Sequence, residues 1–138
     1  MKNVVLLGST GSIGTSTIKV AEDLPDRIRL VGLAAGNNAE LLAQQTFRHQ
    51  PAAICIRDET KVKPLQEMFG SSIQICQGDE GLIQLATMPS ADIVLIAIVG
   101  TAGLRPALAA IRAGKDIAVA SKEILVMAGE IVMAEAPE

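Results

Sequence analysis

Three glycines at regular spacing lie close to the start of the chain. Gly8, Gly11 and Gly14 follow an apolar run at residues 4–7, an arrangement typical of a strand, a tight turn and the start of a helix. A pyrophosphate is held by free backbone N–H groups and the positive end of a helix dipole, with no side chain in the way. Gly8 would provide the sharp bend, Gly11 the close approach to phosphate, and Gly14 the close packing of helix on strand. The loop therefore predicts a phosphate-binding turn, although glycine turns without a ligand share this pattern.

Two later segments carry residues that could also contribute to a nucleotide-binding site. A second glycine-containing loop occupies residues 100–103, and Ser121, Lys122 and Glu123 follow an apolar run. A cation at a helix N-terminus is disfavoured by the dipole, which favours a functional role for Lys122 over a solvated side chain. There its charge would stabilise an oxyanion that develops during a reaction. Glu123 is explained by the helix dipole alone.

These segments are positioned by six repeats of a strand followed by a helix. The strands are expected at residues 4–7, 29–35, 52–57, 72–76, 92–99 and 116–120. Short connections in such a repeat imply a parallel sheet with right-handed crossovers and helices on both faces. We predict an α/β, Rossmann-like doubly wound parallel sheet with strand order 4-3-2-1-5-6. The switch point then lies between strands 1 and 5, where both glycine loops and residues 121–123 meet.

The expected helices have identifiable ends. Asn38 is a good N-cap for a helix at residues 39–49, and Gly70 and Gly114 end the third and fifth helices. Pro64 either lies in the first turn of the third helix or breaks it. In the first helix, one face is expected to hold Ile13, Thr17, Val20, Ala21 and Leu24.

The composition indicates an aliphatic core in a single domain. The 138 residues include no Trp or Tyr and only two Phe, which suits parallel strands covered on both faces. The net charge of −3 gives no case for nucleic-acid or anionic-membrane partners, and no apolar run is long enough to span a membrane. We interpret Cys55 and Cys76 as buried thiols and His49 as structural or exposed. We expect a cytoplasmic protein without a leader peptide.

The end of the second expected strand bears on the choice of nucleotide. NAD-specific folds place a carboxylate there, which accepts a hydrogen bond from the ribose 2′-OH. This chain has Gly36, Asn37 and Asn38 in that place, and asparagine amides can donate to a phosphate. Arg57, at the end of the third expected strand, could reach the same adenosine end. We therefore favour NADPH over NADH, with helix capping as the alternative role of the asparagines.

Four motifs together match one enzyme family in order and spacing. They are GSTGSIG at residues 8–14, AAGNN at 34–38, AIVGTAGL at 97–104 and SKE at 121–123. With them the chain closely resembles the N-terminal NADPH-binding domain of the 1-deoxy-D-xylulose 5-phosphate reductoisomerase family, over essentially all 138 residues. The resemblance implies rearrangement of 1-deoxy-D-xylulose 5-phosphate and hydride transfer from NADPH, giving 2-C-methyl-D-erythritol 4-phosphate for isoprenoid synthesis. It also implies a divalent cation (Mg²⁺, Mn²⁺ or Co²⁺) and a homodimeric full enzyme.

The resemblance also implies roles for individual residues. The cofactor-binding set, with the loop glycines included, is Gly8, Thr10, Gly11, Ser12, Ile13, Gly36, Asn37, Asn38, Gly100, Ser121 and Glu123. Residues 10–13 would hold the pyrophosphate, residues 36–38 the 2′-phosphate end, and Ser121 and Glu123 the nicotinamide side. Lys122 would contact oxygens of the phosphorylated sugar substrate.

Two departures from the family pattern bear on activity. The commonest family residue at Ser121 is Asn, and the shorter serine puts its contact with the cofactor in doubt. The family also continues into a catalytic domain with the metal-binding carboxylates and a C-terminal domain. Glu130, Glu135 and Glu138 look like a solvated face, so we expect no metal ligand here. We expect residues 1–138 to be a cofactor domain that binds NADPH, holds no complete catalytic set and is inactive alone.

Three other functions share glycine loops of this kind. A short-chain dehydrogenase needs a Tyr-x-x-x-Lys pair, and the chain has no Tyr. The cofactor domain of another NADP-dependent two-domain dehydrogenase, such as aspartate-semialdehyde dehydrogenase, leaves residues 121–123 unexplained. A non-catalytic nucleotide-sensing module stays open, since the chain carries no complete catalytic constellation.

Overall fold

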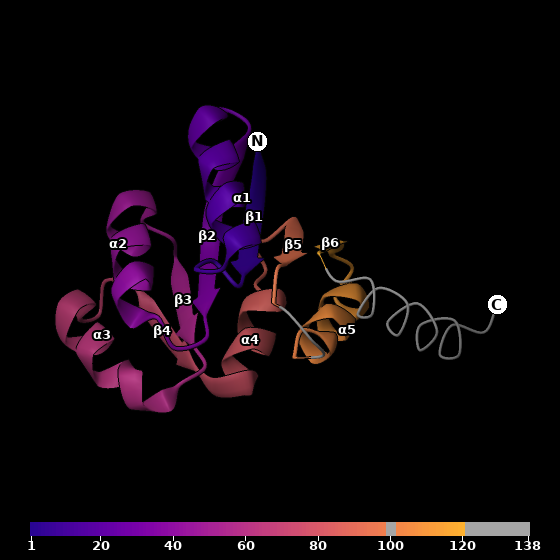
Figure 1. The fold of residues 1–138 in the computed structure, drawn as a ribbon. Coiled ribbons are helices and arrows are strands. Elements are labelled where there is room, and N and C mark those ends of the chain that lie inside the picture. The colour runs from indigo at the N-terminus through magenta and orange to yellow at the C-terminus, as the bar shows by residue number, and fades with distance from the viewer. Residues whose placement is uncertain (99–101, 121–138) are drawn as a thin grey trace.

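The computed structural model describes residues 1–98 and 102–120, which form one six-stranded sheet flanked by helices (Figure 1). The strands are β1 (Lys2–Leu7), β2 (Ile28–Ala35), β3 (Ala53–Ile56), β4 (Gln74–Gln77), β5 (Ile93–Ile96) and β6 (Asp116–Val119). The helices are α1 (Ser12–Asp23), α2 (Ala39–His49), the 3₁₀ turn η1 (Glu59–Lys61), α3 (Val62–Phe69), α4 (Gly78–Ala86) and α5 (Leu104–Arg112).

The sheet is parallel, with the strand order β4-β3-β2-β1-β5-β6. This confirms the predicted order and places the switch point between β1 and β5. Leu7, the last residue of β1, is in register with Ala34 of β2 and with Ile96 of β5. The carboxyl ends of these three strands therefore meet at one edge of the sheet, which is where ligands bind in folds of this kind.

Helices cover both faces of the sheet, as predicted. Val4 and Leu6 of β1 belong to a core with residues of α1, α2 and α3, whereas Val5 and Leu7 belong to a second core with residues of α4 and α5. Residues 4–7 of β1 are therefore all buried, whichever face of the sheet they point to, because helices cover both faces. None of the described helices is long and apolar enough to cross a membrane.

The helix ends confirm several expectations. Asn38 caps α2, and its Oδ1 accepts from the backbone N–H of Leu41 at 3.1 Å. Pro64 lies in the first turn of α3, where its missing N–H breaks no helical hydrogen bond. Gly70 ends that helix with a φ of +59°, a conformation that glycine adopts without strain.

The buried face of α1 differs from the expected one. Its buried residues are Gly14, Ile18 and Ala21. The cause is close contact at Gly14, since a Cβ there would lie 2.0 Å from the carbonyl oxygen of Gly8. Ile18 and Ala21 follow that contact at helical spacing and face the sheet. The expectation followed the larger apolar side chains, and the structure leaves three of them exposed: Ile13, Val20 and Leu24.

Cys55 and Cys76 are buried free thiols, in agreement with their interpretation from the sequence. They are register partners on β3 and β4, and the thiol of Cys55 donates to the carbonyl oxygen of Gly78 at 3.6 Å. The pKa of Cys55 is raised to about 12, chiefly by burial and to a lesser extent by the Cys76 thiol, with the Arg57 guanidinium opposing the shift. Burial also raises the pKa of Cys76. Neither thiol is suited to act as a nucleophile at neutral pH.

The free energy of unfolding is expected to fall as the pH rises above about 9. The Cys55 thiol ionises at its ordinary pKa of 9.0 in the unfolded chain and at about 12 in the folded one. Its contribution is therefore complete below pH 9 and is lost toward pH 12, at up to about 1.4 kcal/mol per pH unit. Urea unfolding at pH 8 and pH 10 checks this, because Cys55→Ala should make the decline shallower. An equal decline in both proteins would contradict it.

Candidate functional site

The glycine loop begins with a bend that only glycine can make. Gly8 has a φ of +95°, and a Cβ on it would lie 2.8 Å from the backbone carbonyl of Ala97. The N–H groups of Gly8 and Ser9 both donate to the carbonyl oxygen of Ala34 at 2.8 Å. The loop is thereby attached to β2 by its backbone and pressed against the segment that follows β5.

The other two glycines have different surroundings. Gly14 touches the loop, as described above. A Cβ on Gly11 would meet one atom only, the carbonyl oxygen of Gly8, at an ordinary van der Waals distance of 3.8 Å. Gly11 is the N-cap of α1 and supplies no side-chain cap, and the first intrahelical bond runs from Thr15 N–H to its carbonyl at 2.9 Å. The amides of the first turn therefore remain available to an external acceptor.

A pocket of about 260 Å³ opens at this point of the fold. It is lined by Gly8, Gly11, Ala34, Ala35, Gly36, Arg57, Leu82, Ala97 and Ile98. Small residues at the ends of β1, β2 and β5 leave the space, and Leu82 of α4 forms an apolar wall. Such a pocket, next to free amides and at the switch point, suits a nucleotide.

A second, more polar pocket of about 460 Å³ adjoins it through Gly36 and Arg57. Its other lining residues are Asn37, Asp58, Glu59, Gly78 and Asp79. Nε and Nη2 of Arg57 both lie 3.0 Å from Oδ1 of Asp79, so the guanidinium is held by a partner on α4. The Asp58 carboxylate accepts from the hydroxyl and the N–H of Thr60, and these bonds lower its pKa. Arg57 is the one basic residue in this lining.

The structure brings most of the predicted phosphate-binding residues to one edge. Gly8, Gly11 and Gly36 line the smaller pocket, and Asn37 lines the larger one. Ser12 and Ile13 form the exposed first turn of α1, with Thr10 half-buried just before it. The predicted residues Gly100, Ser121, Lys122 and Glu123 lie outside the described residues.

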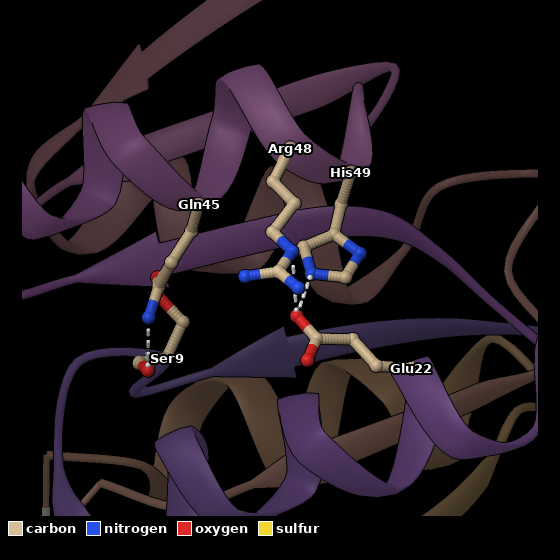
Figure 2. A network of polar contacts seen from close by, with 5 residues as sticks. All are labelled: Ser9, Glu22, Gln45, Arg48 and His49. Carbon is tan, nitrogen blue, oxygen red and sulfur yellow. Dashed lines mark hydrogen bonds and ion pairs between the residues drawn. The ribbon is translucent and has the colours of Figure 1, made fainter.

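Other predicted residues have structural partners. The amide oxygen of Asn38 caps α2, so helix capping, the alternative role of this residue, applies at least to that atom. His49 lies away from the switch point, with Nε2 3.2 Å from Oε2 of Glu22, and Nε of Arg48 is 3.0 Å from the same oxygen (Figure 2). Within residues 1–98 and 102–120, no cluster of His, Cys, Asp or Glu could hold a metal ion.

Sequence reasoning missed two residues of the site. Asp79, which holds Arg57, comes from the next strand–helix unit, and no local spacing links the two. Gln45 of α2 donates from Nε2 to the backbone carbonyl of Ser9 in the glycine loop at 2.9 Å (Figure 2). The sequence does hold a signal for Gln45. It follows the apolar Leu42 by one helical turn, so it is a polar residue on the apolar face of the helix.

Comparison with known proteins agrees with this geometry. The family model described as 1-deoxy-D-xylulose 5-phosphate reductoisomerase matches residues 4–129. The reductoisomerase of Pelotomaculum thermopropionicum is 47% identical over 135 residues, covering 96% of this chain and 35% of the relative. That of Lachnospira eligens is 49% identical over 139 residues, covering 100% of this chain and 36% of the relative. The chain thus spans about a third of the length of these relatives.

Solved structures give the same result. A 1-deoxy-D-xylulose 5-phosphate reductoisomerase from Zymomonas mobilis in complex with NADPH has a TM-score of 0.87 and 40% identity, covering 96% of this chain and 35% of that one. A DOX-P reductoisomerase in complex with magnesium has a TM-score of 0.89 and 38% identity, covering 97% of this chain and 34% of that one. The matches decide against the cofactor domain of an unrelated dehydrogenase. The chain belongs to the 1-deoxy-D-xylulose 5-phosphate reductoisomerase family.

Proposed function

We propose that residues 1–138 are the NADPH-binding domain of an oxidoreductase that converts 1-deoxy-D-xylulose 5-phosphate to 2-C-methyl-D-erythritol 4-phosphate. The observation that carries this proposal is the uncapped N-terminus of α1, which follows the bend at Gly8 and opens beside a pocket at the switch point. The Zymomonas mobilis relative, solved with NADPH, supports the choice of cofactor. The reaction is a rearrangement followed by hydride transfer, and it serves the synthesis of isoprenoid precursors.

The pyrophosphate binds to the glycine loop in this proposal. The N–H groups of Ser12 and Ile13 donate to its oxygens, and the hydroxyls of Thr10 and Ser12 add further donors, whereas the N–H of Gly11 donates to the carbonyl of Gly8 at 3.3 Å. Gly8 shapes the turn, and the absence of a side chain at Gly11 lets the phosphates approach the backbone. The positive end of the α1 dipole favours the anion at the same point.

The adenosine end lies at the carboxyl end of β2. Gly36, Asn37 and the amide nitrogen of Asn38 receive the ribose and its 2′-phosphate, since β2 ends without a carboxylate that would repel it. Gly100, Ser121 and Glu123 line the nicotinamide side, and Lys122 contacts oxygens of the phosphorylated sugar.

The remainder of the enzyme supplies what this chain does not. The ligands of a divalent cation (Mg²⁺, Mn²⁺ or Co²⁺) belong to the catalytic domain of the family, in line with the relative solved with magnesium. The full enzyme is a homodimer in the cytoplasm, where its buried thiols Cys55 and Cys76 stay reduced. Residues 1–138 alone bind the cofactor and do not catalyse the reaction.

Calorimetric titration of the chain with NADPH and with NADH tests the proposal. NADPH is expected to bind at least about tenfold more tightly, because hydrogen bonds to the charged 2′-phosphate contribute about 1.5–3 kcal/mol. Circular dichroism confirms that the titrated chain is folded. Equal affinity would overturn the assignment of residues 36–38, and failure of a folded chain to bind either nucleotide would overturn the cofactor site. Activity of a full-length protein that carries this domain separates the enzyme from a nucleotide-sensing module.

A further inference from the structure

Gln45 is a polar residue on the buried face of α2. It is 7% exposed and follows the fully buried Leu42 by one helical turn. The neighbouring Thr46 is also buried, but its hydroxyl donates to the carbonyl of Leu42 at 2.7 Å, inside the same helix. Gln45 instead extends its amide away from α2, toward the glycine loop (Figure 2).

The contact of Gln45 fixes the loop from α2. Its Nε2 donates at 2.9 Å to the carbonyl oxygen of Ser9, a residue 36 positions earlier in the chain. The N–H of the same Ser9, which is fully buried, donates to Ala34 of β2 at 2.8 Å. The peptide groups on both sides of Ser9 are thus held, one by the sheet and one by α2, just before the free amides of α1.

Two polar atoms beside this hydrogen bond are buried without a partner among the described residues. They are Oγ of Ser9 and Oε1 of Gln45. Buried polar atoms nearly always have partners, so a pair of exceptions at one point calls for a reason. A methionine would fill the place of Gln45 without leaving an unpartnered acceptor, and the glutamine is the choice that gives the Ser9 carbonyl a donor.

The helix that carries Gln45 touches the proposed cofactor site at two points. Its N-cap, Asn38, lies at the turn assigned to the 2′-phosphate, and Gln45 holds the loop assigned to the pyrophosphate. Its last turn is attached to α1 through the contacts of Arg48 and His49 with Glu22 (Figure 2). One helix therefore sets the spacing between the two phosphate sites.

We propose that Gln45 is a positioning residue for the nucleotide. By holding the carbonyl of Ser9, it fixes the orientation of the N–H groups of Ser12 and Ile13 that receive the pyrophosphate. This inference rests on the proposed function of the glycine loop. Because the pyrophosphate is common to NADPH and NADH, Gln45 acts equally on the affinity for both nucleotides.

The test compares Gln45→Met with Thr46→Val in titrations with NADPH and NADH. Both variants keep the side-chain volume and remove one buried hydrogen bond from α2, and both should lower the Tm to a similar extent. Gln45→Met is expected to weaken binding of both nucleotides by about threefold to tenfold, the equivalent of one hydrogen bond, and Thr46→Val to leave both affinities unchanged. If Gln45→Met does not fold, Gln45→Asn, whose amide is one methylene too short to reach Ser9, takes its place with the same expected loss.

The outcomes are distinct. The positioning role would be overturned if the Gln45 variant bound NADPH with wild-type affinity. It would also be overturned if Thr46→Val lost as much affinity, because the Gln45 hydrogen bond would then contribute to folding stability only. Binding of neither nucleotide by the folded wild-type chain would instead overturn the function proposed for the loop.

Discussion

The Gly14→Ala variant is expected to lose at least about 3 kcal/mol of folding stability, the upper range for overpacking a core. A Cβ at residue 14 would lie 2.0 Å from the carbonyl oxygen of Gly8 and 2.7 Å from the Cα of Ser9. These are backbone atoms, and the peptide groups of both residues are fixed by hydrogen bonds to Ala34. No side chain can rotate to relieve the contact, so α1 has to move off the sheet and expose Ile18 and Ala21.

Gly11→Ala is the matched control, with the opposite expected result. Gly11 has φ −79° and ψ 178°, which alanine adopts without strain, and a Cβ there would meet no atom closer than 3.8 Å. Folding stability should therefore be unchanged or higher by less than about 1 kcal/mol. The added methyl group occupies the space beside the first-turn amides, so the affinity for NADPH should fall at least about tenfold, the loss of one charged hydrogen bond.

Urea unfolding and NADPH titration of both variants separate the two roles. For Gly14→Ala, a loss of about 3 kcal/mol corresponds to a decrease in Tm of about 10 °C. The assignment of the two glycines would be wrong if Gly11→Ala lost stability, or if it folded and bound NADPH like the wild type. It would be equally wrong if Gly14→Ala kept the wild-type Tm.

The local features of this site could be predicted from the sequence because each depends on residues close together in the chain. The bend at Gly8, the cap at Asn38 and the end of α3 at Gly70 follow from the backbone preferences of these residue types. The strand order was also predictable, since six strand–helix units with short connections leave few topologies for a parallel sheet. The order of the strands, a long-range property, was thus predictable because short connections restrict it.

The features that the sequence did not reveal depend on contacts between elements. The rotation of α1 about its axis is set by the contact of Gly14 with Gly8, and side-chain hydrophobicity pointed to Ile13 and Val20 instead. The bond from Gln45 to Ser9 joins the second helix to the first loop. In both cases the decisive quantity is a distance between two elements, which neither residue type alone determines.

Arg57 shows the same limit at the pocket beside Gly36 and Asn37. Its position at the end of β3 was enough to predict that it reaches this region, but its pairing with Asp79 was not. That pairing directs the guanidinium along the pocket shared by Gly36 and Asn37, with Nε and Nη2 both 3.0 Å from one carboxylate oxygen. The other charged residues of the pocket are Asp58 and Glu59, both acidic.

Replacement of Arg57 by alanine is therefore expected to abolish or reverse the nucleotide preference. With three carboxylates and no basic residue left in the pocket lining, a 2′-phosphate is repelled, whereas a ribose 2′-OH finds acceptors. NADPH affinity should fall by a factor of about 10–100, the equivalent of 1.5–3 kcal/mol for hydrogen bonds to a charged group, and NADH affinity should change less than about twofold.

Titration of Arg57→Ala, Arg57→Lys and Arg29→Ala with both nucleotides checks this prediction. Lysine keeps the charge without the fork of donors, so it should restore part of the NADPH affinity. Arg29 lies exposed near the start of β2, at the amino end of the sheet, and its removal controls for the loss of one positive charge. An equal loss of NADH and NADPH affinity in Arg57→Ala would place the guanidinium at a part of the cofactor that both nucleotides share. If Arg29→Ala lost as much NADPH affinity as Arg57→Ala, the effect would be one of net charge, because Arg29 does not line the pocket beside Gly36.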